Sequence, residues 1–280
     1  MGTFCLWVWI VSVNRHVMLP ADTTSPIFIG GQRRSGTSLF RVLLNRHPHI
    51  ACGPEAKFAQ RSFIDWHEQL LSQWADLMEV YGLSSRDVDS GIAALVDAVF
   101  TRYQLREGKT RWAEKSPSNI LHIDYLFRLF PRAQFIHALR DPRDTYCSIR
   151  ERTLRDRPEW IKFHPSRAAR DWCNAIFAGR PWRAHPDRYI EVRYEDLVYD
   201  TEACLREVMA FLNEPWDLCL LDADADNAEA RHDQQVRRGP ITATSVGRWR
   251  SELSRSEVKK IERIAGDLMT ELGYTPMVVA

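Results

Sequence analysis

The sequence predicts an α/β fold, a three-layer sandwich in which helices cover both faces of a central parallel sheet. Four short segments are predicted to be strands, at residues 26–30, 112–115, 133–139 and 188–193, and the first of them is an apolar run that ends in glycine. Longer segments with helical spacing of apolar residues separate them. Such strand–helix alternation is typical of parallel sheets, which bind ligands at the carboxyl ends of their strands.

The helices are predicted from apolar spacing and from residues typical of helix ends. His47-Pro48 ends the first helix, because proline disfavours a helical residue before it. Ser85 is a candidate N-cap, Pro142 fits a first helical position, and Gly273 follows the last helix. The expected helices cover about residues 37–46, 59–80, 85–103, 118–130, a segment from 142, 166–178, 201–212 and 254–272. The polar stretch 222–240 is expected to be a loop.

The length allows one large domain or two small ones, and we predict a single domain at residues 26–276. The chain has 280 residues, of which 45% are hydrophobic and 27% charged. We interpret residues 1–25 as an N-terminal extension, either disordered or the product of a misassigned start with Met18 as the natural first residue. The apolar run 4–13 is shorter than the roughly 20 residues that span a bilayer, so we expect no stable membrane insertion.

Charge and cysteine usage narrow the classes of partner. The net charge of +1 gives no general attraction to nucleic acid, so any basic site must be local. The six cysteines form no CxxC pair and match no zinc-binding spacing, and the histidines show no metal spacing either. We therefore expect reduced thiols, a cytoplasmic location and no metal.

The loop at residues 31–38, GQRRSGTS, has the glycine spacing of a P-loop, with Thr37 where a P-loop has lysine. Glycines let the backbone surround an oxyanion, and the N-terminus of the following helix attracts negative charge. Thr37 and Ser38 add hydroxyl donors, and Arg33 or Arg34 can supply the cation. Without the lysine, an ATP-hydrolysing enzyme is disfavoured. The alternative interpretation is a plain glycine-rich turn with exposed arginines.

A second anion site is predicted after the strand at 133–139. Arg140 stands at the end of this strand, and Ser148 and Arg152 lie one helical turn apart on the next helix. Arginine binds phosphate with strong, directional hydrogen bonds. The alternative is a helix start in which Asp141 and Asp144 pair with nearby arginines.

Local sequence also offers groups for acid–base chemistry. Glu55 lies in a loop after the first helix, where it is either a general base or an acidic residue at a helix N-terminus. Lys115 ends a strand, where it is either a cation of the site or a surface lysine, and Glu114 beside it is a second candidate base.

Residues 26–39, PIFIGGQRRSGTSL, resemble the 5′-phosphosulfate-binding loop of sulfotransferases that use 3′-phosphoadenosine 5′-phosphosulfate (PAPS). The similarity is closest to the tyrosylprotein sulfotransferase branch, and it implies the sandwich fold of sulfotransferases and P-loop proteins. By resemblance, the loop binds the donor through Arg33, Arg34, Ser35, Gly36, Thr37 and Ser38. The segment 135–152 resembles the family's 3′-phosphate motif, with Arg140, Ser148 and Arg152 as its contacts.

The resemblance also implies catalytic roles. The segment CGPEAKF is similar to the branch's Cys-Gly-Glu-Glu-Thr-Arg, which makes Glu55 the general base, and Lys115 with Arg34 stabilises charge. Tyr194 is implied as an adenine-side contact and Arg248 as a donor contact. The family's late catalytic serine has no clear counterpart, since the loop 231–238 offers His232, Gln234 and Gln235 instead.

The resemblance predicts an enzyme that moves a sulfuryl group from PAPS to a hydroxyl or amine without a metal ion. The acceptor can be a small molecule, a sugar or a peptide. A homodimer is one expected assembly. The competing hypotheses are a P-loop nucleotide kinase and a non-catalytic nucleotide-binding protein.

Overall fold

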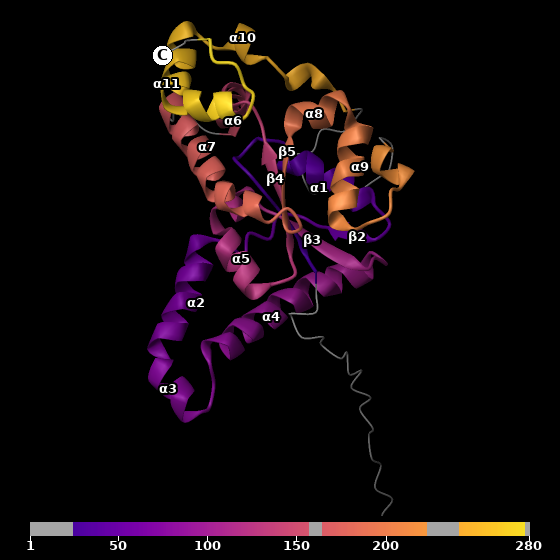
Figure 1. Ribbon diagram of the computed structural model, residues 1–280, viewed down its shortest axis with the longest axis vertical. Coiled ribbons are helices and arrows are strands. Elements are labelled where there is room, and N and C mark those ends of the chain that lie inside the picture. Colours follow the sequence, from indigo (N-terminus) through magenta and orange to yellow (C-terminus); the bar gives the residue numbers. More distant parts are fainter. Residues whose placement is uncertain (1–24, 157–163, 223–240, 278–280) are drawn as a thin grey trace, which may run out of the picture.

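The computed structural model describes residues 25–156, 164–222 and 241–277 (Figure 1). Within these ranges five parallel strands form one sheet in the order β2-β3-β1-β4-β5. The strands are β1 (Ile27–Gly30), β2 (Ile50–Cys52), β3 (Arg111–Lys115), β4 (Gln134–Leu139) and β5 (Tyr189–Arg193). The predicted parallel α/β sandwich is confirmed. Residues 1–24 and the loop 231–238 lie outside the described residues.

Most expected helices are present, with shifted ends. They are α1 (Thr37–Arg46), α2 (Arg61–Gln73), α3 (Ala75–Val80), α4 (Ser85–Arg106), α5 (Ile123–Leu129), α6 (Pro142–Asp156), α7 (Pro165–Gly179), α8 (Tyr194–Tyr199), α9 (Thr201–Leu212), α10 (Trp249–Glu252) and α11 (Arg255–Glu271). Short 3₁₀ turns add η2 (Pro117–His122), η3 (Arg180–Ala184), η4 (Leu218–Leu221) and η6 (Ala243–Ser245). The expected helix 59–80 is two helices, which separate at Trp74. The N-cap of α4 is Ser84, not Ser85, and it forms a capping box with Asp87.

The alternation of side chains along β1 explains the three layers. Ile27 and Ile29 pack with α1 and α9 on one face of the sheet. Phe28, between them, points to the other face, where it packs with α4 and α5. Helix α11 then packs on α7 outside this second layer, through Trp172 and Met269 among others. Both faces of the central strand are therefore buried, as in other parallel sheets.

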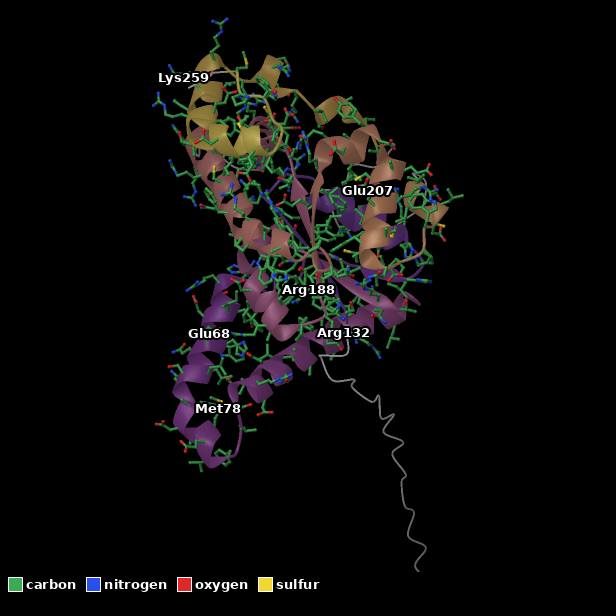
Figure 2. All side chains as sticks on the ribbon, viewed as in Figure 1. Glu68, Met78, Arg132, Arg188, Glu207 and Lys259 are labelled. Atoms are coloured by element: carbon green, nitrogen blue, oxygen red, sulfur yellow. The ribbon has the colours of Figure 1, made fainter. Side chains whose placement is uncertain are left out.

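Helices α2, α3 and the first half of α4 project from the body as a helical arm, which carries Glu68 and Met78 (Figure 2). Buried His67 of this arm hydrogen-bonds through Nδ1 with the Tyr125 hydroxyl of α5 at 2.9 Å. Arg128 donates to Glu68 at 2.7 Å. These polar contacts fix the base of the arm against the sheet domain.

The cysteines agree with the predicted reduced thiols. In the described part of the chain all five are free, and Cys52, Cys147, Cys173 and Cys204 are buried. Burial raises the pKa of the Cys52 thiol to about 12, which keeps it protonated and unreactive at neutral pH. Among the described helices, none combines the length and apolar character needed to cross a membrane.

Candidate active site

A cavity of about 810 Å³ opens where β1, β3 and β4 end. The loop between β1 and α1 forms its floor, and residues from α6, α7, α8 and the segment 241–248 form its walls. The cavity is thus placed where ligands bind in parallel α/β sheets, at the carboxyl ends of the strands.

The loop 31–38 depends on two glycines. Gly31 has a φ of 149°, and a Cβ there would lie 2.4 Å from the carbonyl oxygen of Ala138. Gly36 has a φ of 98°, and a Cβ there would lie 2.6 Å from the ring of Tyr194. Gly36 is also the N-cap of α1 and offers no side chain to its first-turn amides. The N-terminus of α1 therefore remains suited to binding an anion.

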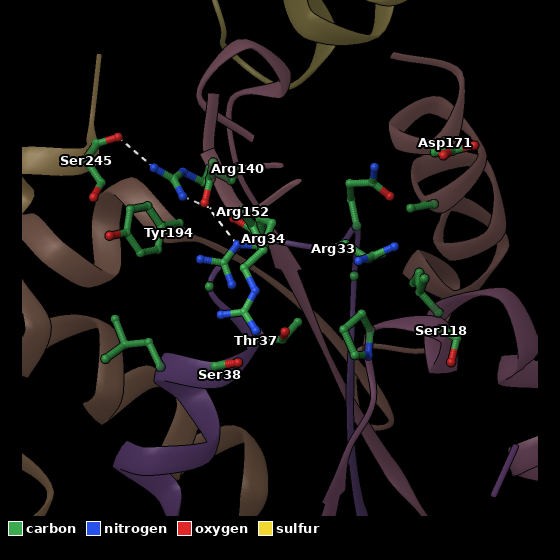
Figure 3. A pocket seen from close by; sticks show the side chains of 18 of the residues that line it. Arg33, Arg34, Thr37, Ser38, Ser118, Arg140, Arg152, Asp171, Tyr194 and Ser245 are labelled. Atoms are coloured by element: carbon green, nitrogen blue, oxygen red, sulfur yellow. Dashed lines mark hydrogen bonds between the residues drawn. The ribbon is translucent and has the colours of Figure 1, made fainter. Parts of the chain in front are cut away.

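The two predicted anion sites meet in one arginine cluster, formed by Arg34, Arg140 and Arg152 (Figure 3). Arg34 Nε donates to Ser148 Oγ at 2.9 Å, so the glycine-rich loop contacts the predicted 3′-phosphate motif directly. Arg140 donates to the carbonyl oxygens of Arg34 at 3.0 Å and Ser245 at 2.6 Å. The Arg140 guanidinium lies 4.3 Å from the centre of the Tyr194 ring.

Electrostatics indicate that this cluster is built for an anion. Burial, and then the charges of Arg152 and Arg140, lower the pKa of Arg34. A bound anion would relieve this repulsion. Arg140 lines the cavity, and its buried Nε has no hydrogen-bond partner among the described residues, so it could donate to an oxyanion there. Ser35, predicted as a donor contact, is buried and does not line the cavity.

The competing interpretation of the charge run after β4 is also partly correct. Arg143 pairs with Asp141 at 2.7 Å and with Glu262 at 2.8 Å, which makes a buried structural network. Asp144 accepts instead from the backbone amides of Gly247 at 2.7 Å and Trp249 at 3.0 Å. The acidic residues thus hold the fold, while Arg140, Ser148 and Arg152 line the cavity.

Glu55 and Lys115 come together next to the loop. Lys115 Nζ lies 2.5 Å from Glu55 Oε1 and 3.3 Å from Ser38 Oγ. The Lys115 side chain is fully buried, so the surface-lysine interpretation is wrong. Glu55 is 19% exposed, lines the cavity and has Lys57 Nζ 3.7 Å from its other oxygen. Glu55 and Ser38 line the cavity, and the Lys115 ammonium lies behind them, in contact with both.

Glu114 is not placed as a base. It is 1% exposed, is absent from the cavity wall and accepts hydrogen bonds from Ser116 Oγ and Asn119 Nδ2, each at 2.6 Å. Burial raises the pKa of its carboxyl. The prediction that Glu114 is a second base is wrong, because its hydrogen-bond partners hold the carboxylate in the protein interior.

Two other predicted contacts of the donor, Arg33 and Arg248, lie apart from the arginine cluster or are already paired with carboxylates. The Arg33 side chain points away from the arginine cluster, toward the side of the cavity where Ser118 and Asp171 lie (Figure 3). Arg248 lines the cavity but pairs with Glu252 at 2.6 Å and with Glu151 at 2.9 Å.

Sequence reasoning missed the wall opposite the arginine cluster. Ser118 and Asp171 lie on this side of the cavity (Figure 3), and the lining also includes the polar residues Lys57, Gln60, Arg167 and Asn174 and the apolar residues Pro117, Ile120, Leu121 and Ala175. Arg167, Asp171 and Asn174 belong to α7, where spacings of four and three residues place them on one face of the helix. This spacing of polar residues could have been recognised in the sequence.

One group of metal-ligating side chains gathers elsewhere, formed by His47, His49 and Glu214. His47 Nε2 bonds the carbonyl oxygen of Pro215 at 2.9 Å, and its Nδ1 accepts from the His49 amide at 3.2 Å. Both ring nitrogens of this buried histidine already have protein partners, which suits a structural role.

A family model of sulfotransferases matches residues 26–218, which include the loop, Glu55, Lys115 and the arginine cluster. The chain belongs to the sulfotransferase family. This sulfotransferase is 28% identical to protein-tyrosine sulfotransferase A of Caenorhabditis elegans, over 91% of its own chain and 69% of that protein. It is 27% identical to the protein-tyrosine sulfotransferase of Drosophila melanogaster, over 95% of its own chain and 54% of that protein.

Solved structures show the same fold. The sulfotransferase domain of the Synechococcus PCC 7002 olefin synthase aligns with a TM-score of 0.58 and 25% identity, over 86% of this sulfotransferase and 95% of that domain. The sulfotransferase domain from the curacin biosynthetic pathway aligns with a TM-score of 0.59 and 22% identity, over 90% of this chain and 98% of that domain.

Proposed function

We propose that this sulfotransferase transfers the sulfuryl group of PAPS to a hydroxyl group of an acceptor, with Glu55 as the general base. The observation that carries the proposal is the contact of Lys115 with both Glu55 and Ser38, at 2.5 and 3.3 Å. This contact joins the proposed base to the end of the loop that is suited to an oxyanion. Sulfuryl transfer needs a base at the acceptor oxygen and positive charge at the leaving oxygen, by analogy with phosphoryl transfer.

The residues of the cavity fit the two anionic groups of PAPS. The amides of the loop and the hydroxyls of Thr37 and Ser38 would hold the 5′-phosphosulfate. Arg140, Ser148 and Arg152 would hold the 3′-phosphate, and Tyr194 would lie beside the adenine. Because Arg34 contacts Ser148, its guanidinium is shared between the two groups. PAPS supplies an activated sulfuryl group that is bound to a phosphate oxygen.

In the proposed reaction Glu55 takes the proton of the acceptor hydroxyl while that oxygen forms a bond to sulfur. The bond from sulfur to the phosphate oxygen breaks, and 3′-phosphoadenosine 5′-phosphate (PAP) leaves. The Lys115 ammonium lies next to the loop and stabilises the charge that develops on the leaving oxygen. Lysine and arginine supply the positive charge, so the proposed reaction uses no metal ion.

Of the acceptor classes considered, a protein tyrosine has the most support. The curated relatives named above are protein-tyrosine sulfotransferases that align over most of this chain. A sugar or a small molecule is the alternative, because the cavity lining includes polar side chains such as Gln60, Asp171 and Asn174. The residue before Glu55 is Pro54, where the tyrosylprotein branch has glutamate, and this difference counts against a peptide tyrosine.

A two-step experiment tests the proposal. Thermal unfolding is measured with PAP and, separately, with ATP and Mg²⁺. Transfer of labelled sulfate from PAPS is then measured to tyrosine peptides, sugars and phenols. We expect stabilisation by PAP, transfer to at least one acceptor class and a large loss of transfer in Glu55→Gln at saturating PAPS. Stabilisation only by ATP with Mg²⁺ would support a kinase, and PAP binding without any transfer would support a non-catalytic protein.

A further inference from the structure

Glu114 and Lys115 are neighbours on β3, and their side chains lie on opposite faces of the sheet. Lys115 reaches the loop and Glu55. Glu114 pairs in register with Phe28 of β1, and Phe28 belongs to the face covered by α4 and α5. The Glu114 carboxylate is therefore enclosed in the protein instead of lining the cavity.

The partners of Glu114 include the segment that carries the proposed base. Glu114 Oε1 accepts from the backbone amide of Ala56 at 3.3 Å and from Ser116 Oγ at 2.6 Å. Ser116 Oγ in turn accepts from the backbone amide of Lys57 at 3.2 Å. The two amides that directly follow Glu55 are thus fixed to β3 through one buried carboxylate and one buried hydroxyl.

This segment has no helix or strand of its own to hold its shape. Residues 53–60 connect β2 to α2 as irregular backbone. Lys57 has a φ of 53°, in the left-handed region that residues with a side chain rarely adopt. Such a conformation persists only where the surrounding contacts enforce it. Glu114 and Ser116 provide the contacts at this point of the chain.

We propose that Glu114 is a positioning residue, whose carboxylate holds the segment after Glu55 so that Glu55 stays against Lys115. This inference rests on the proposed role of Glu55 as base. A buried carboxylate is costly unless donors surround it, and the donors here are Ala56, Ser116 and Asn119. Glutamine has the same shape but replaces one acceptor oxygen with a donor, which would face one of these N–H groups.

A double-mutant cycle tests the proposal with Glu114→Gln, Glu55→Gln and the double variant. We expect Glu114→Gln alone to lower kcat about 10- to 100-fold, as expected for a misplaced catalytic group, with PAP affinity unchanged. In the Glu55→Gln background the same substitution should have little further effect, because Glu114 acts through Glu55. Equal losses in both backgrounds would overturn the positioning role.

The pH profile of kcat gives a second readout. If Glu114 positions Glu55, the Glu114→Gln variant keeps the acidic limb of the profile at a lower kcat, whereas Glu55→Gln removes that limb. Loss of the acidic limb in Glu114→Gln would instead make Glu114 the base. Full activity of Glu55→Gln would overturn the proposed base, a result distinct from either outcome for Glu114.

Two further variants control for folding. Glu262→Gln changes another buried carboxylate, which is 5% exposed and bound to Arg143 outside the cavity wall, and it should lower stability without lowering kcat. Ser116→Ala removes only the hydroxyl that links Glu114 to the Lys57 amide. If Glu114→Gln does not fold, Ser116→Ala should still lower kcat at unchanged PAP affinity, and an unchanged kcat would refute the proposal.

Discussion

Lys115 Nζ lies 2.5 Å from Glu55 Oε1, although Lys115 ends β3 and Glu55 follows β2. The two strands are hydrogen-bonded neighbours, with Cys52 beside Ala113. Their parallel register therefore sets the distance between the proposed base and the buried ammonium.

Lys115→Met should remove the charge next to the leaving oxygen. We expect kcat to fall by about 10²- to 10³-fold, the effect of losing one donor that stabilises a transition state. Lys109→Met is the matched control, because the Lys109 ammonium donates to the backbone carbonyl oxygens of Asn45 and Ile50, which do not line the cavity, whereas Lys115 contacts Glu55 and Ser38, which do. Steady-state transfer from PAPS measures both variants, and an equal fall in kcat for both would contradict the role of Lys115.

Arg152→Ala should weaken recognition of the 3′-phosphate specifically. Hydrogen bonds to charged groups contribute about 1.5–3 kcal/mol, so PAP affinity should fall about 10- to 100-fold. The affinity for adenosine 5′-phosphate, which lacks the 3′-phosphate, should not change. Isothermal titration with both nucleotides measures the difference, and equal losses for the two would place Arg152 elsewhere in the site.

Gly36→Ala should disrupt the loop, because the new Cβ would lie 2.6 Å from the Tyr194 ring at a φ of 98°. We expect loss of PAP binding and a loss of stability of about 1–2 kcal/mol from the backbone conformation alone. Gly91→Ala is the control. A Cβ at Gly91, within α4, meets nothing within 4 Å, and this change should stabilise the protein by about 0.5–1 kcal/mol. Urea unfolding and PAP titration check both variants.

Arg33→Ala should affect the acceptor more than the donor, because the Arg33 side chain points away from the arginine cluster (Figure 3). We expect a higher KM for the acceptor at unchanged PAP affinity. Arg34→Ala should weaken PAP binding and leave the KM for the acceptor unchanged, since Arg34 contacts Ser148. If Arg33→Ala weakens PAP binding as much as Arg34→Ala does, Arg33 is a donor ligand, as the resemblance implies.

Stability should fall in mild acid because of His137. This buried residue hydrogen-bonds Tyr189, and burial lowers its pKa below the ordinary value of about 6.5. Below that pH the unfolded chain binds a proton that the folded chain resists, so stability decreases as pH falls. In His137→Gln this loss is absent. Urea unfolding measures the free energy of unfolding of both proteins, and the difference between them should narrow from about pH 7 to about pH 5. If the two free energies of unfolding change in parallel with pH, the role of His137 is contradicted.

The fold class and four of the strands could be predicted from the sequence, because β1 and β4 are mainly apolar and each of the four strands leads into a recognisable motif. The sequence was not sufficient for β2, since Ile50–Cys52 is short and is defined by its pairing with β3. The break at Trp74 was also missed, because the apolar pattern of α2 continues into α3.

For the site, local sequence placed Arg140, Ser148 and Lys115 at strand ends or on the following helix. It could not show that Arg34 contacts Ser148, because that contact joins segments distant along the chain. Glu114 was misread for the same reason. Ala56 and Asn119 surround its carboxylate only once β2, β3 and η2 are assembled.

The position of β1 at the centre of the sheet also governs how the protein acquires its site. Ile27 pairs with Ala113 on one side and with Gln134 on the other, both far along the chain. Parallel pairings at such sequence separation form slowly, because the intervening chain must lose entropy before the contacts stabilise it. The glycine-rich loop directly follows β1, Arg140 directly follows β4, and Lys115 is the last residue of β3. The donor site therefore arises in the same folding event as the centre of the sheet, and a nucleotide bound there stabilises only chains that have completed this event.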